Sequence, residues 1–317
     1  MKSLYPEIEP SASFRLEAGD GHYVYVEECG NPQGVPLVFL HGGPGSGCRP
    51  YHRRLFDPGR YRTVLLDQRG AGRSTPAGEL ADNTTGRLLA DLELIRTTLG
   101  VDRWVVFGGS WGAALGLLYA QRHPERVSGM VLRGSFLARQ RDLDWYLHDG
   151  ARRIYPERWE ELSKILPVQP GVDILQTLHE VFYGPDELAK LRLARAWAQW
   201  GAQLTLGPEF DPTEVESRSP TLLMHQFAIE LHYARKRYFI GENQILDQCN
   251  RLPEVPVTLI HGRLDLVCPP DAAFALKERI PRAELQILPQ AGHSGSSEAM
   301  IDALVAAADR MAARLAP

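Results

Sequence analysis

Residues 108–112 read Gly-Gly-Ser-Trp-Gly and directly follow the apolar run Trp104–Phe107. The spacing Gly-x-Ser-x-Gly between a strand and a helix permits a tight turn that lifts the serine hydroxyl off a sheet. The helix that begins there directs free N–H groups at developing negative charge. The stretch is typical of a nucleophile at Ser110. A glycine-rich turn that serves only close packing fits the motif equally well when the motif is taken alone.

A nucleophilic serine needs a base and a group that holds the base, because a free hydroxyl is weak. Two later stretches end predicted strands with suitable side chains: residues 255–265 end at Asp265, and residues 283–293 end at His293. Open sheets of this kind place their sites at the carboxyl ends of strands. The order serine, acid, histidine and the three placements together predict a triad, in which Asp265 fixes the tautomer of His293.

A tetrahedral intermediate also needs donors for its oxyanion. Residues 40–47 read Leu-His-Gly-Gly-Pro-Gly-Ser-Gly and follow a long apolar run, so their backbone N–H groups are open to a ligand. We predict that the N–H groups of Gly43 and Trp111 form the oxyanion hole. Nearby, Asp67 and Arg69 flank another glycine turn, and we interpret them as members of scaffold ion pairs.

The elements that must position these groups alternate along the chain. Apolar runs at 35–43, 61–70, 103–109 and 127–135 predict strands buried on both faces, as in a parallel sheet. Residues 22–30 alternate in polarity and predict a hairpin strand. Helical patterns follow at 83–100, with Asn83 as the expected N-cap, and at 111–123, before Pro124. This alternation predicts an α/β fold with a mostly parallel central sheet flanked by helices.

Residues 137–250 interrupt the alternation and contain no buried-strand run. Residues 187–200 and 221–239 read as helices. We therefore expect a helical cap at 137–250, inserted after the sixth strand, on a core formed by 1–136 and 251–317.

Bulk properties narrow the function further. The 317 residues carry a net charge of -4, which argues against a nucleic-acid partner. No apolar run is long enough for a membrane span, and the first residues do not resemble a signal peptide. The four cysteines are scattered, without metal-ligand spacing, and are expected to be free thiols: Cys29, Cys48, Cys249 and Cys268. These patterns predict a cytoplasmic protein without cofactor or metal; they say nothing about its oligomeric state.

Several stretches together resemble the proline iminopeptidase (prolyl aminopeptidase) family of α/β-hydrolases across residues 25–295. The most specific are His-Gly-Gly-Pro-Gly at 41–45, Asp-Gln-Arg-Gly at 67–70 and Gly-Gly-Ser-Trp-Gly at 108–112. The resemblance implies a metal-free serine peptidase that removes N-terminal proline and carries a helical cap. It also implies the roles given above for Ser110, Asp265, His293, Gly43 and Trp111.

In that family two cap glutamates bind the substrate amine. One lies in a segment similar to residues 227–233 and points to Glu230. The other follows a tryptophan in an earlier cap helix, where this chain has Gly201 after Trp200. Glu209 and Asp211 are candidates to replace the missing acid. We expect Phe136, Trp145 and Tyr146 to bind substrate together with Glu230, whose alternative role is that of a solvent-facing helix residue.

The sequence therefore predicts a serine hydrolase that releases N-terminal proline, or a similar small residue, from peptides through an acyl-enzyme. The missing acid leaves a related alternative, an enzyme that cleaves another small amide, lactam or ester. A non-catalytic ligand-binding receptor on the same fold is a third alternative, against which the complete triad argues.

Overall fold

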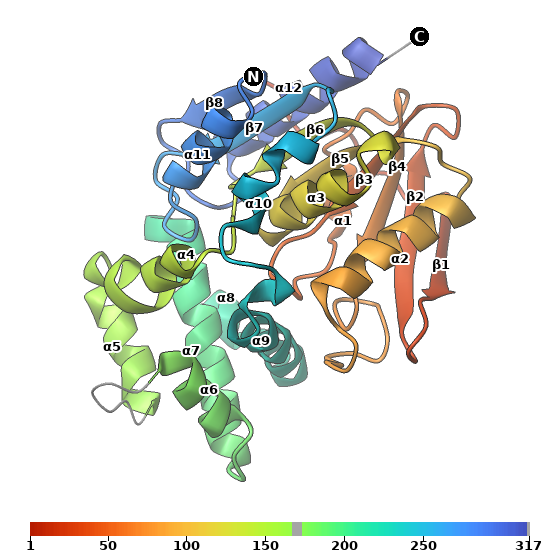
Figure 1. The fold of residues 1–317 in the computed structure, drawn as a ribbon. Coiled ribbons are helices and arrows are strands. Elements are labelled where there is room, and N and C mark those ends of the chain that lie inside the picture. Colours follow the sequence, from red (N-terminus) through yellow and green to blue (C-terminus); the bar gives the residue numbers. More distant parts are fainter. Residues whose placement is uncertain (167–172, 316–317) are drawn as a thin grey trace.

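A sheet of eight strands forms the centre of the molecule (Figure 1), in a computed structural model that describes residues 1–166 and 173–315. The strands lie in the order β1-β2-β4-β3-β5-β6-β7-β8. Their bounds are β1 Ala12–Glu17, β2 Tyr23–Gly30, β3 Val35–Leu40, β4 Tyr61–Asp67, β5 Trp104–Gly109, β6 Val127–Arg133, β7 Val257–Gly262 and β8 Glu284–Leu288.

The pairing of the strands confirms the predicted mostly parallel sheet. Strands β1 and β2 pair antiparallel, as do β2 and β4, and every pair from β4 to β8 is parallel. All residues of β5 and β7 are buried, as the continuous apolar runs predicted. Because the parallel strands point the same way, the loops after β3, β5, β6, β7 and β8 meet at one edge of the sheet.

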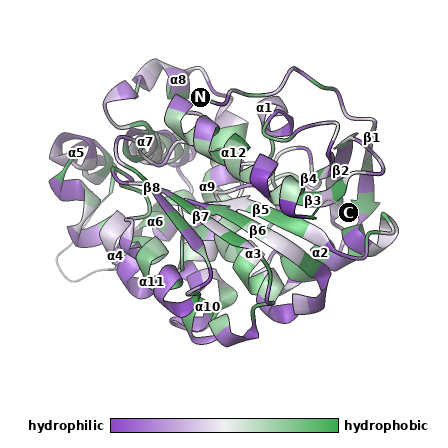
Figure 2. Cartoon of the chain, turned by 90° about the horizontal axis from the view of Figure 1, so that it is seen from above, coloured by the Kyte–Doolittle hydropathy of each residue, from purple (hydrophilic) through white to green (hydrophobic). Residues whose placement is uncertain are grey.

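Helices cover both faces of the sheet (Figure 2). Apolar residues of α2, α3 and α11 pack on one face, and those of α12 pack on the other. The helices of the described residues are α1 Pro50–Arg53, α2 Thr85–Thr98, α3 Trp111–Arg122, α4 Gln140–Asp144, α5 Pro156–Ile165, α6 Ile174–Phe182, α7 Glu187–Leu206, α8 Pro212–Glu216, α9 Pro220–Arg235, α10 Gln244–Asp247, α11 Asp271–Arg279 and α12 Glu298–Leu315.

A group of helices is inserted after the sixth strand, as predicted, and stands beyond one edge of the sheet (Figure 1). Helices α5, α6, α7 and α9 share a hydrophobic cluster of their own, which includes Trp197 and Trp200. The last residues of the insertion pack elsewhere: Ile245, Leu246 and Cys249 belong to the hydrophobic cluster on the sheet. Residues 167–172 of the expected cap lie outside the described residues.

Two local predictions were wrong. The N-cap of α2 is Thr84, whose Oγ1 accepts a hydrogen bond from the Arg87 N–H, and not Asn83. The Asn83 side chain instead donates to the carbonyl oxygens of Arg69 and Glu79 and accepts from the Tyr233 hydroxyl. The helical pattern expected to run to residue 239 ends at Arg235, because residues 237–239 have positive φ angles.

Candidate active site

Ser110 occupies a strained turn between β5 and α3. Its φ of 57° and ψ of -123° lie outside the regions that most residues adopt, and such a residue costs about 1–3 kcal/mol. The surrounding structure holds it there: the Ser110 N–H donates to the Arg133 carbonyl oxygen at 2.9 Å, and the Ser110 carbonyl oxygen accepts from Ala113 at 2.9 Å. Strain maintained in this way is typical of a functional residue.

Two glycines make this turn possible. A Cβ added to Gly112 would collide with the carbonyl oxygen of Leu40, and one added to Gly108 would collide with that of Gly112. The start of α3 can therefore approach both β3 and β5 only without side chains at these positions. This close approach is the physical reason for the glycines around Ser110.

His293 and Asp265 form a hydrogen-bonded pair in the loops after β8 and β7. The His293 Nδ1 lies 2.7 Å from the Asp265 Oδ2, and both residues are buried. In the neutral ring that donates its Nδ1–H to the carboxylate, the other nitrogen, Nε2, carries no proton and can act as a base. His293 lines the same cavity as Ser110.

Asp265 is held in its ionised form. Burial alone would raise its pKa, but the charge of His293 and its hydrogen bond, together with backbone donors, hold the pKa below the ordinary range. The Asp265 Oδ1 accepts from the N–H groups of Val267 at 3.0 Å and Cys268 at 2.8 Å. His261 Nε2 lies 3.4 Å from the other oxygen, Oδ2, and donates to the Cys268 carbonyl oxygen at 2.7 Å.

Gln68 ties the glycine loop after β3 to the turn at Ser110. Its side-chain oxygen accepts from the Trp111 indole at 2.8 Å, and its side-chain nitrogen donates to the His41 carbonyl oxygen at 2.9 Å. The backbone N–H of Gln68 donates to the His41 Nε2 at 2.9 Å. Trp111 is the first residue of α3, so its N–H has no carbonyl partner within the helix. This framework fixes the glycine loop, which carries Gly43, relative to the start of α3.

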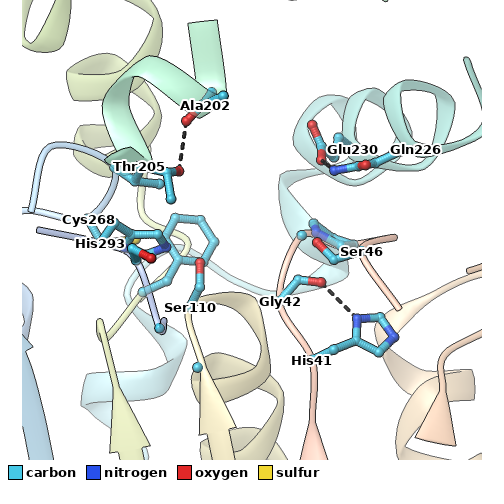
Figure 3. Close-up of a pocket in the computed structure, with 18 of the residues that line it drawn as sticks. His41, Gly42, Ser46, Ser110, Ala202, Thr205, Gln226, Glu230, Cys268 and His293 are labelled. Carbon is cyan, nitrogen blue, oxygen red and sulfur yellow. Dashed lines mark hydrogen bonds between the residues drawn. The ribbon is translucent and has the colours of Figure 1, made fainter. Parts of the chain in front are cut away.

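A cavity of about 690 Å³ lies between the sheet edge and the inserted helices. Figure 3 shows Ser110 and His293 on one side of it, and Glu230 and Gln226 on α9 across from them. Gly43, Phe136 and Tyr146 line it as well. The cavity therefore brings together most of the residues that the sequence predicted for the site.

Glu230 is fixed by two donors. Its Oε2 accepts from the Trp197 indole at 2.6 Å, and its Oε1 accepts from the Gln226 side chain at 2.7 Å. Burial nevertheless raises the pKa of Glu230, because these two bonds and the charge of Arg218 do not fully offset the loss of water. The residue is thus a cavity-facing carboxylate and not a solvent-facing helix residue.

The second acid is absent from its expected place. Gly201 lines the cavity, and a Cβ there would lie 3.1 Å from the Tyr146 hydroxyl. Glu209 and Asp211 are exposed; neither lines the cavity, and Asp211 caps α8 by accepting from Thr213. Neither candidate therefore places a carboxylate at the cavity in this structure.

Trp145 also differs from the expectation. Trp145 does not line the cavity that the described residues form. Its indole N–H donates to the Leu266 carbonyl oxygen at 2.8 Å. It therefore packs behind the site, whereas its neighbour Tyr146 faces the cavity and stacks edge-on against Trp197.

Sequence reasoning missed several lining residues, among them Trp197, Gln226, Arg49 and Arg218. A signal existed for Gln226, which lies four residues before Glu230 and hence on the same helix face. No comparable pattern marks the arginines, because they lie in separate loops that only the tertiary fold brings to one cavity.

The fold and the turn at Ser110 define the class of protein: this chain is an α/β-hydrolase. A family model described as alpha/beta hydrolase fold matches residues 35–164. Solved structures agree on the fold. They include the esterase RhEst1 from Rhodococcus sp. ECU1013 (TM-score 0.64, 19% identity, 96% of this chain and 99% of that one) and a proline iminopeptidase from Mycobacterium smegmatis (TM-score 0.58, 22% identity, 96% and 99%).

Full-length relatives narrow the class. A proline iminopeptidase from Xylella fastidiosa (strain 9a5c) is 44% identical over 311 residues, with 98% of this chain and 99% of that protein covered. A proline iminopeptidase from Arabidopsis thaliana is 41% identical over 98% of this chain and 83% of that protein. The chain therefore belongs to the proline iminopeptidase family and is a hydrolase. These relatives do not favour the alternative amide, lactam or ester specificity, or the non-catalytic receptor.

Two further properties concern the described residues alone. None of the helices within 1–166 and 173–315 is long and apolar enough to cross a membrane. No group of three or more histidine, cysteine or acidic side chains in these ranges is arranged to hold a metal ion. The four cysteines are free thiols.

Proposed function

We propose that this chain is a serine aminopeptidase that releases N-terminal proline from short peptides. The observation that carries the proposal is the shared cavity, in which Ser110 and His293, paired with Asp265, lie across from the half-buried carboxylate of Glu230. The cavity thus holds a reactive hydroxyl at Ser110 and a site for a cation at Glu230. This combination suits a substrate whose scissile carbonyl is next to its free amine. The family relationship supports the same activity.

In the proposed reaction the Ser110 Oγ attacks the carbonyl carbon of proline, and the His293 Nε2 takes the hydroxyl proton. Asp265 holds the Nδ1–H and stabilises the imidazolium that forms. The N–H groups of Gly43 and Trp111 stabilise the oxyanion, where each such donor contributes roughly 3–4 kcal/mol to lowering the barrier. His293 then protonates the leaving amine, the C–N bond breaks, and water releases proline from the acyl-enzyme.

Glu230 binds the substrate ammonium in this proposal, and Phe136 and Tyr146 contact the proline ring. A cation enclosed without a counter-charge is costly, so the carboxylate is what admits the charged amine. The bonds from Trp197 and Gln226 hold both carboxylate oxygens in place. With Gly201 in place of an acid, Glu230 carries this role without the second carboxylate.

We further propose that residues 137–250 act as the cap over a core of 1–136 and 251–317. The cap helices would close the cavity around a small substrate, with the segment after α9 packed on the core. The net charge of -4 supports a peptide and not a nucleic acid as the partner. We place the enzyme in the cytoplasm, to which its free thiols are suited.

The test compares three aryl-amides that share the same aryl amine leaving group and differ in the acyl part, which is prolyl, alanyl or cyclopentanecarbonyl. The last has the shape of proline without its nitrogen. We expect the prolyl compound to have the highest kcat/KM. A preference for the cyclopentanecarbonyl compound, or for simple aryl esters over all three, would contradict the proposal.

A further inference from the structure

Three guanidinium groups line the cavity, at Arg49, Arg133 and Arg218. Arg133 has a partner, because its Nη1 donates to the His293 carbonyl oxygen at 2.8 Å. Within residues 1–166 and 173–315, Arg49 and Arg218 form no salt bridge, whereas Arg53, Arg69 and Arg73 all do. None of these three guanidinium groups therefore has a carboxylate partner among the described residues, and for Arg49 and Arg218 no backbone carbonyl oxygen takes its place.

The carboxylates of the cavity are committed elsewhere or too distant to pair with these arginines. Asp142 pairs with Arg139 at 2.7 Å. Glu230 bonds Trp197 and Gln226, and Glu214 lines the cavity without a salt bridge to either arginine. Arg49 and Arg218 therefore have no ion-pair partner among the described residues, and Glu230 acts on the charge of Arg218 only across Gln226.

Arg218 is partly buried, so this lack of a partner has a cost. Loss of water and the positive charge of Arg49 lower its pKa from the ordinary arginine value. One of its nitrogens, Nη2, donates to the Gln226 side-chain oxygen at 2.6 Å. The remaining donors of its planar fork suit a bidentate acceptor such as a carboxylate.

Arg218 lies close to the proposed amine site. Gln226 bonds Arg218 on one side and Glu230 on the other, so a single side chain separates the cation from the proposed amine site. An extended peptide of two residues spans at most about 7 Å. Arg49 follows the glycine loop after β3. Burial lowers the pKa of His52 to about 3, and the charges of His41, Arg49 and Arg133 add to this lowering.

We propose that Arg49 and Arg218 form a subsite for the C-terminal carboxylate of a short peptide whose N-terminal proline is bound at Glu230. The subsite rests on the proposed aminopeptidase function and deepens it, because it makes dipeptides with a free carboxyl end the favoured substrates. The ammonium of the substrate faces Glu230, its scissile carbonyl faces Ser110, and its carboxylate neutralises the two guanidinium groups.

The experiment compares prolyl-alanine with prolyl-alanine amide, which differ only in the charge of the carboxyl end. For the unmodified enzyme we expect kcat/KM for the acid to exceed that for the amide by roughly ten- to hundredfold, as a charged hydrogen bond allows. The ratio should fall towards one in Arg49→Gln and in Arg218→Gln. It should also fall as ionic strength rises, because salt screens the exposed Arg49.

The ratio is taken within each variant, so any effect of Arg218→Gln on the orientation of Gln226 acts on both substrates and cancels. Arg60→Gln is the matched control: Arg60 is 55% exposed, lies just before β4 at the opposite edge of the sheet, and should keep the ratio of the unmodified enzyme. Arg49→Lys keeps the charge without the planar fork and should give an intermediate ratio.

A ratio near one in the unmodified enzyme, or a high ratio that both glutamine variants retain, would overturn the carboxylate subsite. Prolyl aryl-amide has no carboxylate and reports separately on the aminopeptidase itself. Turnover of that compound with a ratio near one rejects the subsite alone. Failure to cleave any proline substrate rejects the proposed function on which the subsite rests.

Discussion

The Nδ1 of His293 lies 2.7 Å from the Oδ2 of Asp265, and this pair is buried beside the cavity that Ser110 lines. The carboxylate fixes which ring nitrogen carries the proton. We expect Asp265→Asn to lower kcat by on the order of 10⁴, because an amide favours the wrong tautomer of His293. The measurement is kcat on a prolyl aryl-amide, and circular dichroism should show an unchanged fold. A loss of less than about tenfold would contradict the assignment of the acid.

Ser110→Ala should remove nearly all turnover, with a loss on the order of 10⁶ in kcat. An aryl phosphonate should add to the unmodified protein once, and peptide mass spectrometry should locate the adduct at Ser110. His293→Ala should be as damaging as the serine change, because the groups act as a unit. Labelling of another serine, or a variant with nearly full activity, would refute the mechanism.

The core of the fold was predictable because its signals are local. Strands β3, β4, β5 and β6 are runs of apolar residues that end in glycine turns, and both the runs and the turns are visible in the chain. The positions of Ser110, Asp265 and His293 at one edge of the sheet were predictable for the same reason, since each follows a parallel strand. Their roles as a triad stay a prediction.

Contacts between distant segments were not predictable. Asn83 resembles an N-cap in sequence, but its side chain bonds Arg69 and Tyr233, which lie 14 and 150 positions away in the chain. The exclusion of Trp145 from the cavity depends on a carbonyl oxygen of Leu266, 121 positions away. Short-range patterns do not contain such information, and most of the cavity wall is made of contacts of this type.

The interpretation of Arg69 as a scaffold residue leads to a stability prediction. Arg69 makes a buried bidentate bond to Asp91, with distances of 2.7 and 2.9 Å. We expect Arg69→Met to lower the free energy of unfolding by about 3–5 kcal/mol, because it leaves Asp91 buried and unpaired. Urea denaturation measures this. The double variant Arg69→Met/Asp91→Leu should recover much of the loss, and a single variant with unchanged stability would contradict the prediction.

Because the pKa of Glu230 is raised, we expect the binding of the substrate amine to depend on pH independently of the triad. On acidification the Glu230 carboxylate takes up a proton at a higher pH than an ordinary glutamate does, and the neutral form no longer attracts the ammonium. We expect the kcat/KM ratio of prolyl to cyclopentanecarbonyl aryl-amide to fall with decreasing pH, starting above the ordinary glutamate range.

The triad contributes equally to both of these substrates, so its own titration cancels in the ratio. Glu230→Gln should give a low ratio that does not change with pH. A ratio that is flat in the unmodified enzyme, or that still falls in the glutamine variant, would show that other groups bind the amine.

The family resemblance implies two cap glutamates that bind the substrate amine, whereas this chain has Gly201 at the place of the second. This difference leads to a further prediction. If Glu230 binds the amine without a second carboxylate, a new acid at residue 201 should strengthen the recognition of proline. A charged hydrogen bond contributes roughly 1.5–3 kcal/mol, or about one to two decades in kcat/KM. Gly201→Glu should therefore raise the prolyl to cyclopentanecarbonyl ratio by about that amount. The space is narrow, because the first added carbon would lie 3.1 Å from the Tyr146 hydroxyl.

Gly201→Gln separates charge from size, since it places a side chain of the same shape without the carboxylate. It should leave the ratio near that of the unmodified enzyme and lower both rates equally if the added atoms crowd Tyr146. Tyr146→Phe in the Gly201→Glu background removes the crowded oxygen and should recover turnover while the higher ratio persists. A Gly201→Glu variant that folds, cleaves the cyclopentanecarbonyl compound and shows no gain for proline would mean that residue 201 does not reach the amine.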